Sequence, residues 1–227
     1  MTLKNNDGYI VLGLDISSTT IGWAAIDFNK NKLIDSGYIK PPKTDDLIED
    51  LAKTRNKVLE LFNKIKPNYI GIENIISFMG GKSTAATIIM LTTFNRMTCL
   101  LSHDYLNKKP ELFNVMTIRH GLKIGKILPK KEEMPELVAK HLGITFPYEY
   151  ETNKRSKITK ITEESYDTAD GVAVALYYAF VLTGKIIPKI KKPATKKSKA
   201  KKKTPKMKPG AGGKPRSPKL VKKGTKS

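Results

Sequence analysis

The chain has 227 residues, of which 42 are Lys or Arg and 21 are Asp or Glu, so its formal net charge is +21. Its one cysteine, Cys99, excludes a disulfide framework and a cysteine-based zinc site, and no apolar run approaches the ~18–20 residues of a membrane span. Residues 1–20 also lack the basic and then apolar layout of a secretory signal, so we expect a soluble, intracellular protein without a membrane partner.

The excess positive charge lies at the C-terminal end. Residues 185–227 contain 18 Lys or Arg and no acid, which leaves 24 basic and 21 acidic residues in 1–184. Because Pro, Gly, Lys, Ser and Thr dominate 185–227, this segment cannot bury enough apolar surface to offset its ordering entropy. We therefore expect one domain over 1–184 and a disordered Lys-rich tail that adds salt-sensitive, sequence-independent affinity for nucleic acid.

The first elements expected along the chain are strands and one helix. Tyr9–Asp15, Ile21–Phe28 and Lys32–Ile39 are rich in β-branched and aromatic residues and are joined by short turns, which predicts an antiparallel meander. Asp46–Lys66 has apolar residues at helical spacing, and Tyr69–Glu73 is again strand-like. A strand, a helix and a second strand in this order predict a parallel pair with a crossover helix.

Helices dominate the rest of the expected domain. Thr84–Leu106 is the longest helical candidate and has apolar residues on several faces, Phe113–Ile118 is a fifth strand candidate, and Lys131–Leu142 is a charged amphipathic helix. Tyr166–Leu182 is an apolar helix opened by Ser165, and the polar segment between Pro147 and Ile161 is expected to be a loop on the substrate side. The fold class is α/β, with a five-stranded mixed sheet of three antiparallel and two parallel strands, flanked by helices.

Four carboxylates converge in this topology. Asp15 ends the first strand, and the crossover places Glu73, at the end of the fourth strand candidate, beside it. Asp167 and Asp170 are spaced i,i+3 and share one face of the last helix. Such a density of hard oxygen ligands suits Mg²⁺ or Mn²⁺, and two such ions ~3.5–4 Å apart can clamp both oxygens of an in-line phosphodiester displacement. A two-metal nuclease follows as a hypothesis.

Three motifs carry a resemblance to a known family. Leu12–Trp23 (LGLDISSTTIGW), Ile72-Glu73 and Tyr166–Leu176 (YDTADGVAVAL) resemble the RuvC-type Holliday junction resolvases of the RNase H-like superfamily, including the poxvirus resolvases. The resemblance covers residues 9–183. It implies an RNase H-like fold and a Mg²⁺-dependent crossover junction endonuclease acting in DNA recombination and repair. It also implies that Asp15, Glu73, Asp167 and Asp170 hold two Mg²⁺ ions, for which Mn²⁺ can substitute.

The same resemblance implies a DNA-binding set and a homodimer. Thr117–Lys126 (TIRHGLKIGK) looks like the basic strand-exit segment of the family, where Arg119, Lys123 or Lys126 would contact the scissile phosphate. Phe78 lies where relatives place an aromatic that stacks at the opened junction. The candidate DNA contacts are Phe78, Lys82, Arg119, Lys123, Lys126, Lys154 and Arg155. Four-way junctions are two-fold symmetric substrates, and spare apolar faces of Thr84–Leu106 are available for a dimer interface.

Two other functions remain open from the sequence. A strand that ends in Asp and is followed by a Ser/Thr-rich turn and a strand also resembles the phosphate-binding hairpin of sugar kinases and actin, although 184 residues are few for the two domains that enclose ATP. A non-catalytic or architectural DNA-binding protein could instead rely on the tail for its affinity. The Lys-rich tail and the poxvirus resemblance would suit a nucleus or a viral replication compartment.

Overall fold

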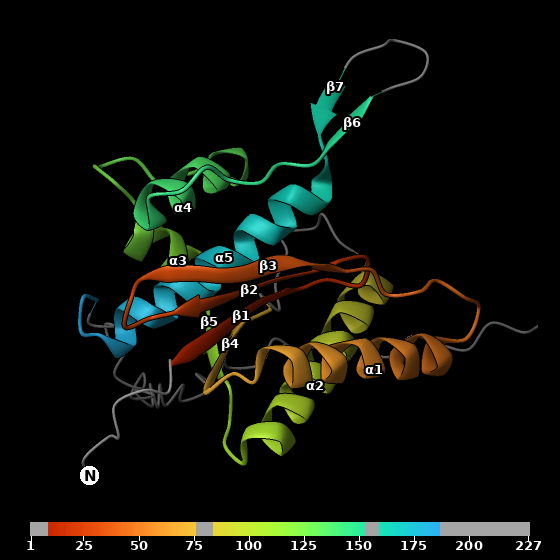
Figure 1. Ribbon diagram of the computed structural model, residues 1–227. Coiled ribbons are helices and arrows are strands. Elements are labelled where there is room, and N and C mark those ends of the chain that lie inside the picture. Colours follow the sequence, from red (N-terminus) through yellow and green to blue (C-terminus); the bar gives the residue numbers. More distant parts are fainter. Residues whose placement is uncertain (1–8, 76–83, 153–158, 187–227) are drawn as a thin grey trace, which may run out of the picture. The chain divides into compact units, whose positions relative to one another are not determined.

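The computed structural model describes residues 9–75, 84–152 and 159–186, and the helices and strands given below lie within these ranges (Figure 1). The expected DNA contacts Phe78, Lys82, Lys154 and Arg155 lie outside the described residues, as does nearly all of the expected tail. The boundary between residues 184 and 185 therefore stays a prediction.

A five-stranded sheet forms the centre of the domain. Strands β1 (Ile10–Ile16), β2 (Ile21–Asp27) and β3 (Lys32–Ile39) make the expected antiparallel meander. Strand β4 (Tyr69–Glu73) pairs in parallel with β1, and β5 (Glu111–Phe113) pairs in parallel with β4. The strand order is β3-β2-β1-β4-β5, which confirms the mixed sheet predicted from the sequence.

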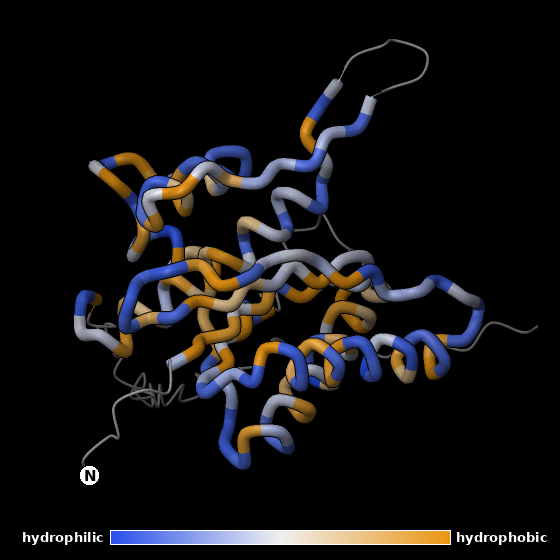
Figure 2. Tube along the Cα trace, in the orientation of Figure 1, coloured by the Kyte–Doolittle hydropathy of each residue, from blue (hydrophilic) through white to orange (hydrophobic). Residues whose placement is uncertain are grey.

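Helices cover both faces of this sheet (Figure 1). On one face, α1 (Leu47–Ile65) and α2 (Ala85–Leu106) bury side chains such as Phe62 and Phe94 against Leu12, Leu14 and Ile72. On the other face lie α3 (Val115–Leu122), α4 (Met134–Leu142) and α5 (Glu163–Leu182). A short 3₁₀ helix, η1 (Lys131–Glu133), leads into α4. Figure 2 shows the hydrophobic residues concentrated in the strands and in α5.

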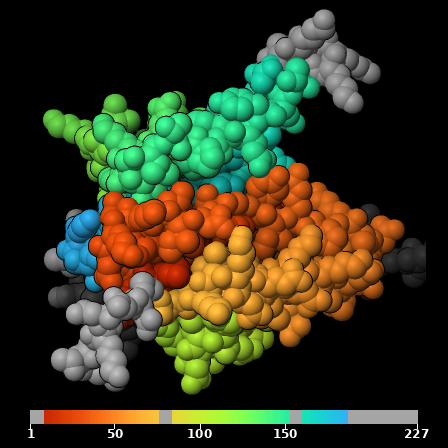
Figure 3. Space-filling view, in the orientation of Figure 1, coloured from red at the N-terminus to blue at the C-terminus, as the bar shows by residue number. Residues whose placement is uncertain are grey.

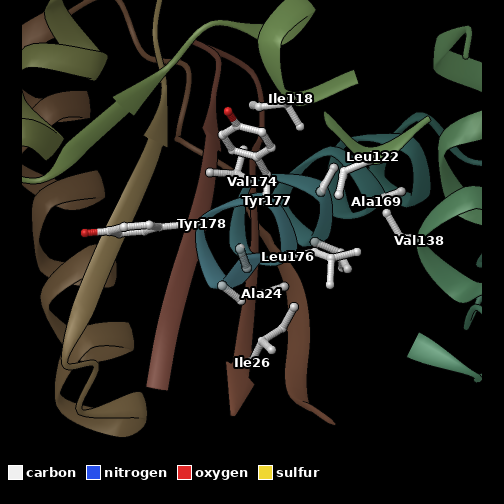
Figure 4. Close-up of a cluster of buried hydrophobic side chains, with 14 of the residues drawn as sticks. Ala24, Ile26, Ile118, Leu122, Val138, Ala169, Val174, Leu176, Tyr177 and Tyr178 are labelled. Carbon is white, nitrogen blue, oxygen red and sulfur yellow. The ribbon is translucent and has the colours of Figure 1, made fainter. Parts of the chain in front are cut away.

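Helix α5 is buried over most of its circumference, which explains why its sequence is apolar nearly all round. Ala169 and Val174 on this helix are fully buried, and Tyr177 is 1% exposed. Figure 4 shows these side chains between the sheet residues Ala24 and Ile26 on one side and Ile118, Leu122 and Val138 of α3 and α4 on the other. Helix α5 therefore acts as the central element of this half of the core.

Glycines allow α5 to touch the sheet backbone directly. A β-carbon at Gly22 would lie 1.8 Å from the carbonyl oxygen of Asp167, and one at Gly13 would lie 2.2 Å from the amide nitrogen of Ala175. From the helix side, a β-carbon at Gly171 would lie 2.7 Å from the carbonyl carbon of Gly22. Because each contact is to backbone, which cannot turn away as a side chain can, these positions exclude any larger residue.

The fifth strand and the segment after it differ from the sequence-based prediction. The expected strand Phe113–Ile118 is wrong: β5 ends at Phe113, and α3 follows it directly. The Asn114 side chain accepts a hydrogen bond from the Met116 amide at 2.9 Å and so caps the helix. Ile118 and Leu122, one helical turn apart, are both buried against α5.

The region before α5 also differs. The predicted loop contains an antiparallel pair of short strands, β6 (Tyr150–Thr152) and β7 (Thr159–Ile161), which extend away from the sheet in Figure 1. Helix α5 begins three residues before the expected position, because the Thr162 side chain accepts a hydrogen bond from the Ser165 amide and serves as the N-cap. Asp167 and Asp170 consequently lie in the second turn of the helix.

None of the helices within the described ranges is long and apolar enough to cross a membrane.

The glycine contacts predict a large effect of one methyl group. Gly22→Ala should lower the free energy of unfolding by about 3 kcal/mol, because α5 must move away from β2 to accommodate the β-carbon. Gly37→Ala is the matched control, since the three atoms nearest to its β-carbon would belong to the Trp23 side chain, the first at 3.2 Å. Urea unfolding of both variants measures the difference, and an equally small loss in the two would contradict the proposed role of this backbone contact.

Candidate active site

Asp15 and Glu73 lie at the same end of neighbouring strands. Asp15 is the sixth residue of β1, and Glu73 is the last residue of β4. In the parallel pairing of these strands Leu14 is opposite Ile72. Asp15 and Glu73 are the next residues on the two strands, so they lie side by side. Both side chains are partly buried. This is the juxtaposition expected from the strand–helix–strand topology.

Helix α5 brings Asp167 and Asp170 to the same end of the sheet. Asp15 is opposite Gly22 in the antiparallel β1–β2 pair, and Gly22 touches the backbone of Asp167. The Asp170 side chain is buried, with 8% of its surface exposed, and Asp167 is partly buried. The close approach of helix and strand thus places the acids of α5 next to Asp15.

The pKa values of these carboxyl groups show how closely they interact. Burial raises the pKa of Asp15 well above its ordinary value, and the charges of Glu73, Asp170 and Asp167 raise it further. Burial also raises the pKa of Glu73 to about 7 and that of Asp170 to about 6. Concentrated negative charge in a partly desolvated position is typical of functional sites that bind a cation.

Two cations, Lys131 and Arg119, face this acidic group. Lys131 of η1 donates a hydrogen bond from Nζ to Asp167 Oδ1 at 2.8 Å. Burial lowers the pKa of Lys131, but this hydrogen bond and the charges of Asp167, Asp170 and Asp15 outweigh burial and leave the pKa raised. Arg119 of α3 lowers the pKa of Glu73 and of Asp170 by its charge, and Lys131 does the same.

The basic residues predicted from the sequence occupy different positions relative to the acids. Arg119 is partly buried, and its Nε has no hydrogen-bond partner among the described residues, which leaves that donor free for a ligand. Lys123 ends α3, and Lys126 is exposed in the segment that follows, so neither lies on a strand exit. Lys131 was not among the site residues predicted from the sequence, since a lysine in a run of charges at a helix start is usually solvated.

The chemistry of the donor set fits a divalent cation. Within the described ranges no three His, Cys, Asp or Glu side chains lie close enough together to form a ready-made metal site. The four carboxylates nonetheless supply hard oxygen ligands from three elements, and their mutual repulsion raises the pKa of Asp15. A divalent cation relieves that repulsion. Without such an ion, the Lys131 ammonium supplies a single positive charge next to the acids.

Comparisons in sequence point to RuvC. No protein-family model matches the chain. The crossover junction endodeoxyribonuclease RuvC of Fusobacterium nucleatum is 25% identical over 137 residues, which are 60% of this chain and 69% of the relative. RuvC of Endomicrobium trichonymphae is 29% identical over 97 residues, and there the chain spans about half, 51%, of the relative's length.

Comparisons in structure identify the same fold. Thermus thermophilus RuvC, solved in complex with a Holliday junction substrate, gives a TM-score of 0.55 at 19% identity and covers 78% of this chain and 96% of that one. The yeast mitochondrial Holliday junction resolvase Ydc2 gives a TM-score of 0.53 at 15% identity, covering 76% of this chain and 78% of that one. The RuvC-like, RNase H-like fold expected from the three motifs is confirmed.

The raised pKa values predict how pH changes the stability of the protein without metal. Glu73 and Asp170, with pKa values of about 7 and about 6, keep protons in the folded state that the unfolded chain has already lost. Their contribution to the free energy of unfolding is therefore fully present below the ordinary carboxyl pKa, and it is lost as pH rises to about 7. In EDTA, Glu73→Gln/Asp170→Asn should be more stable than wild type at pH 8 by ~1–3 kcal/mol, and the difference should vanish near pH 4.

Thermal unfolding across this pH range measures that difference. Asp104→Asn, which removes an exposed acid of α2, serves as the control and should leave the pH profile unchanged. A constant difference between wild type and the double variant from pH 4 to pH 8 would contradict the raised pKa values.

Proposed function

We propose that this chain is a structure-selective DNA endonuclease that resolves four-way junctions by metal-assisted hydrolysis of phosphodiesters. The observation that carries the proposal is the convergence of Asp15, Glu73, Asp167 and Asp170 from β1, β4 and α5, together with the raised pKa values of Asp15, Glu73 and Asp170. The similarity to two bacterial RuvC proteins, which are named as crossover junction endodeoxyribonucleases, supports the substrate class. DNA recombination is the corresponding biological process.

In this proposal, Asp15, Glu73, Asp167 and Asp170 hold two Mg²⁺ ions, and Mn²⁺ can replace them. Bound divalent ions would polarise the scissile phosphate and lower the pKa of the attacking water. The carboxylates contribute by holding the ions between two rigid strands and one buried helix. Because β1, β4 and α5 pack closely together, the ligands are positioned before DNA arrives.

Lys131 and Arg119 have complementary tasks in the proposed reaction. Lys131 has its ammonium on Asp167, and once Asp167 is neutralised by another cation the same ammonium is free to donate to a phosphate oxygen. Arg119 acts on Glu73 and Asp170 by its charge and retains an unpartnered Nε, so it can stabilise negative charge that develops on the phosphate. Lys123 and Lys126 would contact the DNA backbone further from the reacting atoms. Phe78, Lys82, Lys154 and Arg155 remain proposed DNA contacts.

A homodimer is part of the same proposal, because paired cuts in a two-fold symmetric junction need two active sites. One face of α2 packs Phe94 and Leu101 into the core, whereas Ile89 and Leu100 are each 62% exposed. Two exposed aliphatic side chains eleven residues apart lie on one side of the helix, at three helical turns. A second copy of this chain would bury this stripe.

Removal of one metal ligand should separate cleavage from binding. Asp15→Asn should lower the rate of cleavage of a labelled four-way junction in Mg²⁺ by at least ~1,000-fold, because the acids act as a unit. Binding of the junction should remain within a few-fold of wild type. Asp45→Asn changes an exposed acid in the connection before α1 and should cleave normally.

Linear duplex, single-stranded and flap DNA are included as alternative substrates in the cleavage experiment. Equal cleavage by wild type and Asp15→Asn would contradict the assigned site. Binding without cleavage by either protein would instead favour the architectural function.

A charge in the α2 stripe should prevent dimer formation. Leu100→Glu should shift the mass measured by light scattering from two copies to one and should abolish paired cuts, because a carboxylate cannot be buried unpaired at an apolar interface. Ile48→Glu is the matched control, since Ile48 is also exposed, at 72%, but lies on α1. An unchanged mass for Leu100→Glu, or a wild-type monomer that makes paired cuts, would overturn the α2 interface.

A further inference from the structure

A groove runs beside the proposed active site. Its walls are formed by the β1–β2 turn, by the connection that follows β3, and by the first turns of α5. The side chains that carry the argument are Ser17, Thr19, Lys40, Lys43, Lys131 and Asp167. In Figure 3 the connection after β3 lies next to the start of α5 and the hairpin strands on the same face of the molecule.

A second hollow begins on the other side of Lys131. It is lined by Lys160 of β7, by Tyr166 of α5 and by residues of η1 and the start of α5. Lys131 and Glu163 line both hollows, so the two meet at the lysine that contacts Asp167. The two hollows therefore adjoin at Lys131 and Glu163, and the first of them is also lined by the proposed metal ligand Asp167.

The lining of the first groove suits a sugar–phosphate backbone. Hydroxyl and ammonium groups are common ligands of phosphate and sugar oxygens in protein–DNA complexes. The β1–β2 turn is held in shape because Ser17 Oγ accepts a hydrogen bond from the Thr20 amide at 2.9 Å and donates one to the Thr20 carbonyl at 2.7 Å. Thr19, at the tip of this turn, is exposed.

Two of the lysines, Lys40 and Lys160, have exposed side chains that form ion pairs with carboxylates. Lys40 pairs with Glu164 at 2.5 Å, and Lys160 pairs with Glu151 at 2.9 Å. Exposed pairs contribute little to stability, so phosphates can replace the carboxylates as partners. Because acids alternate with the lysines along the lining, a single small anion gains little here. A polymer with regularly spaced phosphates can reach several lysines at once.

We propose that the DNA strand carrying the scissile phosphate passes through both hollows and crosses Lys131 between them. Lys40 and Lys43 contact its backbone on one side of the scissile phosphate, and Lys160 and Tyr166 contact it on the other side. The β6–β7 pair is therefore a DNA-contacting element. This path rests on the proposed nuclease function in one respect, because that function determines where on the path the scissile phosphate lies.

The path is tested by photo-cross-linking with the full chain. A benzoylphenylalanine replaces Lys43 or Lys160 in the Asp15→Asn background, and each protein is cross-linked to an end-labelled four-way junction in Mg²⁺. The cross-linked nucleotides are mapped against the nick made separately by wild type. We expect position 43 and position 160 to react on opposite sides of the nick. Replacement of Lys53, which lies on α1 and lines neither hollow, should give no cross-link near the nick.

Salt dependence of binding provides a second readout. Lys43→Gln and Lys160→Gln should each reduce the slope of log affinity against log salt by about 0.9, the value for one lost phosphate contact, while Lys53→Gln should not. Cross-links from 43 and 160 on the same side of the nick, or unchanged slopes while wild type cuts the junction, would overturn the path. Failure of wild type to cut any junction would overturn the nuclease proposal, which the cleavage assay reports independently of the cross-links.

Discussion

The arrangement of this site depends on a contact between backbone atoms. Gly22 is opposite Asp15 in the β1–β2 pair, and the space that a β-carbon would occupy on Gly22 is filled by the carbonyl group of Asp167. Gly13 and Gly171 allow the same close approach along the next turns of α5. The separation between Asp15 and the acids of the helix is therefore set by backbone packing. Side chains with alternative rotamers could not fix it as firmly.

The electrostatics of the site follow from this packing. Carboxylates brought together and partly buried hold their protons more tightly, as the raised pKa values of Asp15, Glu73 and Asp170 show. Lys131 and Arg119 offset part of the negative charge from the neighbouring η1 and α3. In the proposed reaction the same two cations would be free to act on a phosphate once divalent ions occupied the site, so one set of charges would serve both the empty and the loaded protein.

The parts of the fold that were predictable from the sequence are those with a clear local pattern. Strands β3 and β4 were predicted with their observed bounds, and the position of Glu73 next to Asp15 followed from the crossover rule. Helix α3 was missed because its first residues, Val115 to Ile118, include β-branched residues, which favour a strand. Its packing against α5, which stabilises the helix, is a tertiary contact that the local sequence does not indicate. Lys131 was missed because its partner Asp167 is 36 residues away, and no spacing in the sequence indicates that η1 packs against α5.

The central claim is that α5 completes one two-metal site with β1 and β4. Anomalous diffraction from crystals of the wild-type protein soaked in Mn²⁺ tests it most directly. The packing of α5 on Gly22 predicts anomalous peaks bounded by the carboxylates of Asp15 and of Asp170 or Asp167, with the ammonium of Lys131 displaced from Asp167. Ordered Mn²⁺ bound only elsewhere, with Lys131 still on Asp167, would contradict the claim.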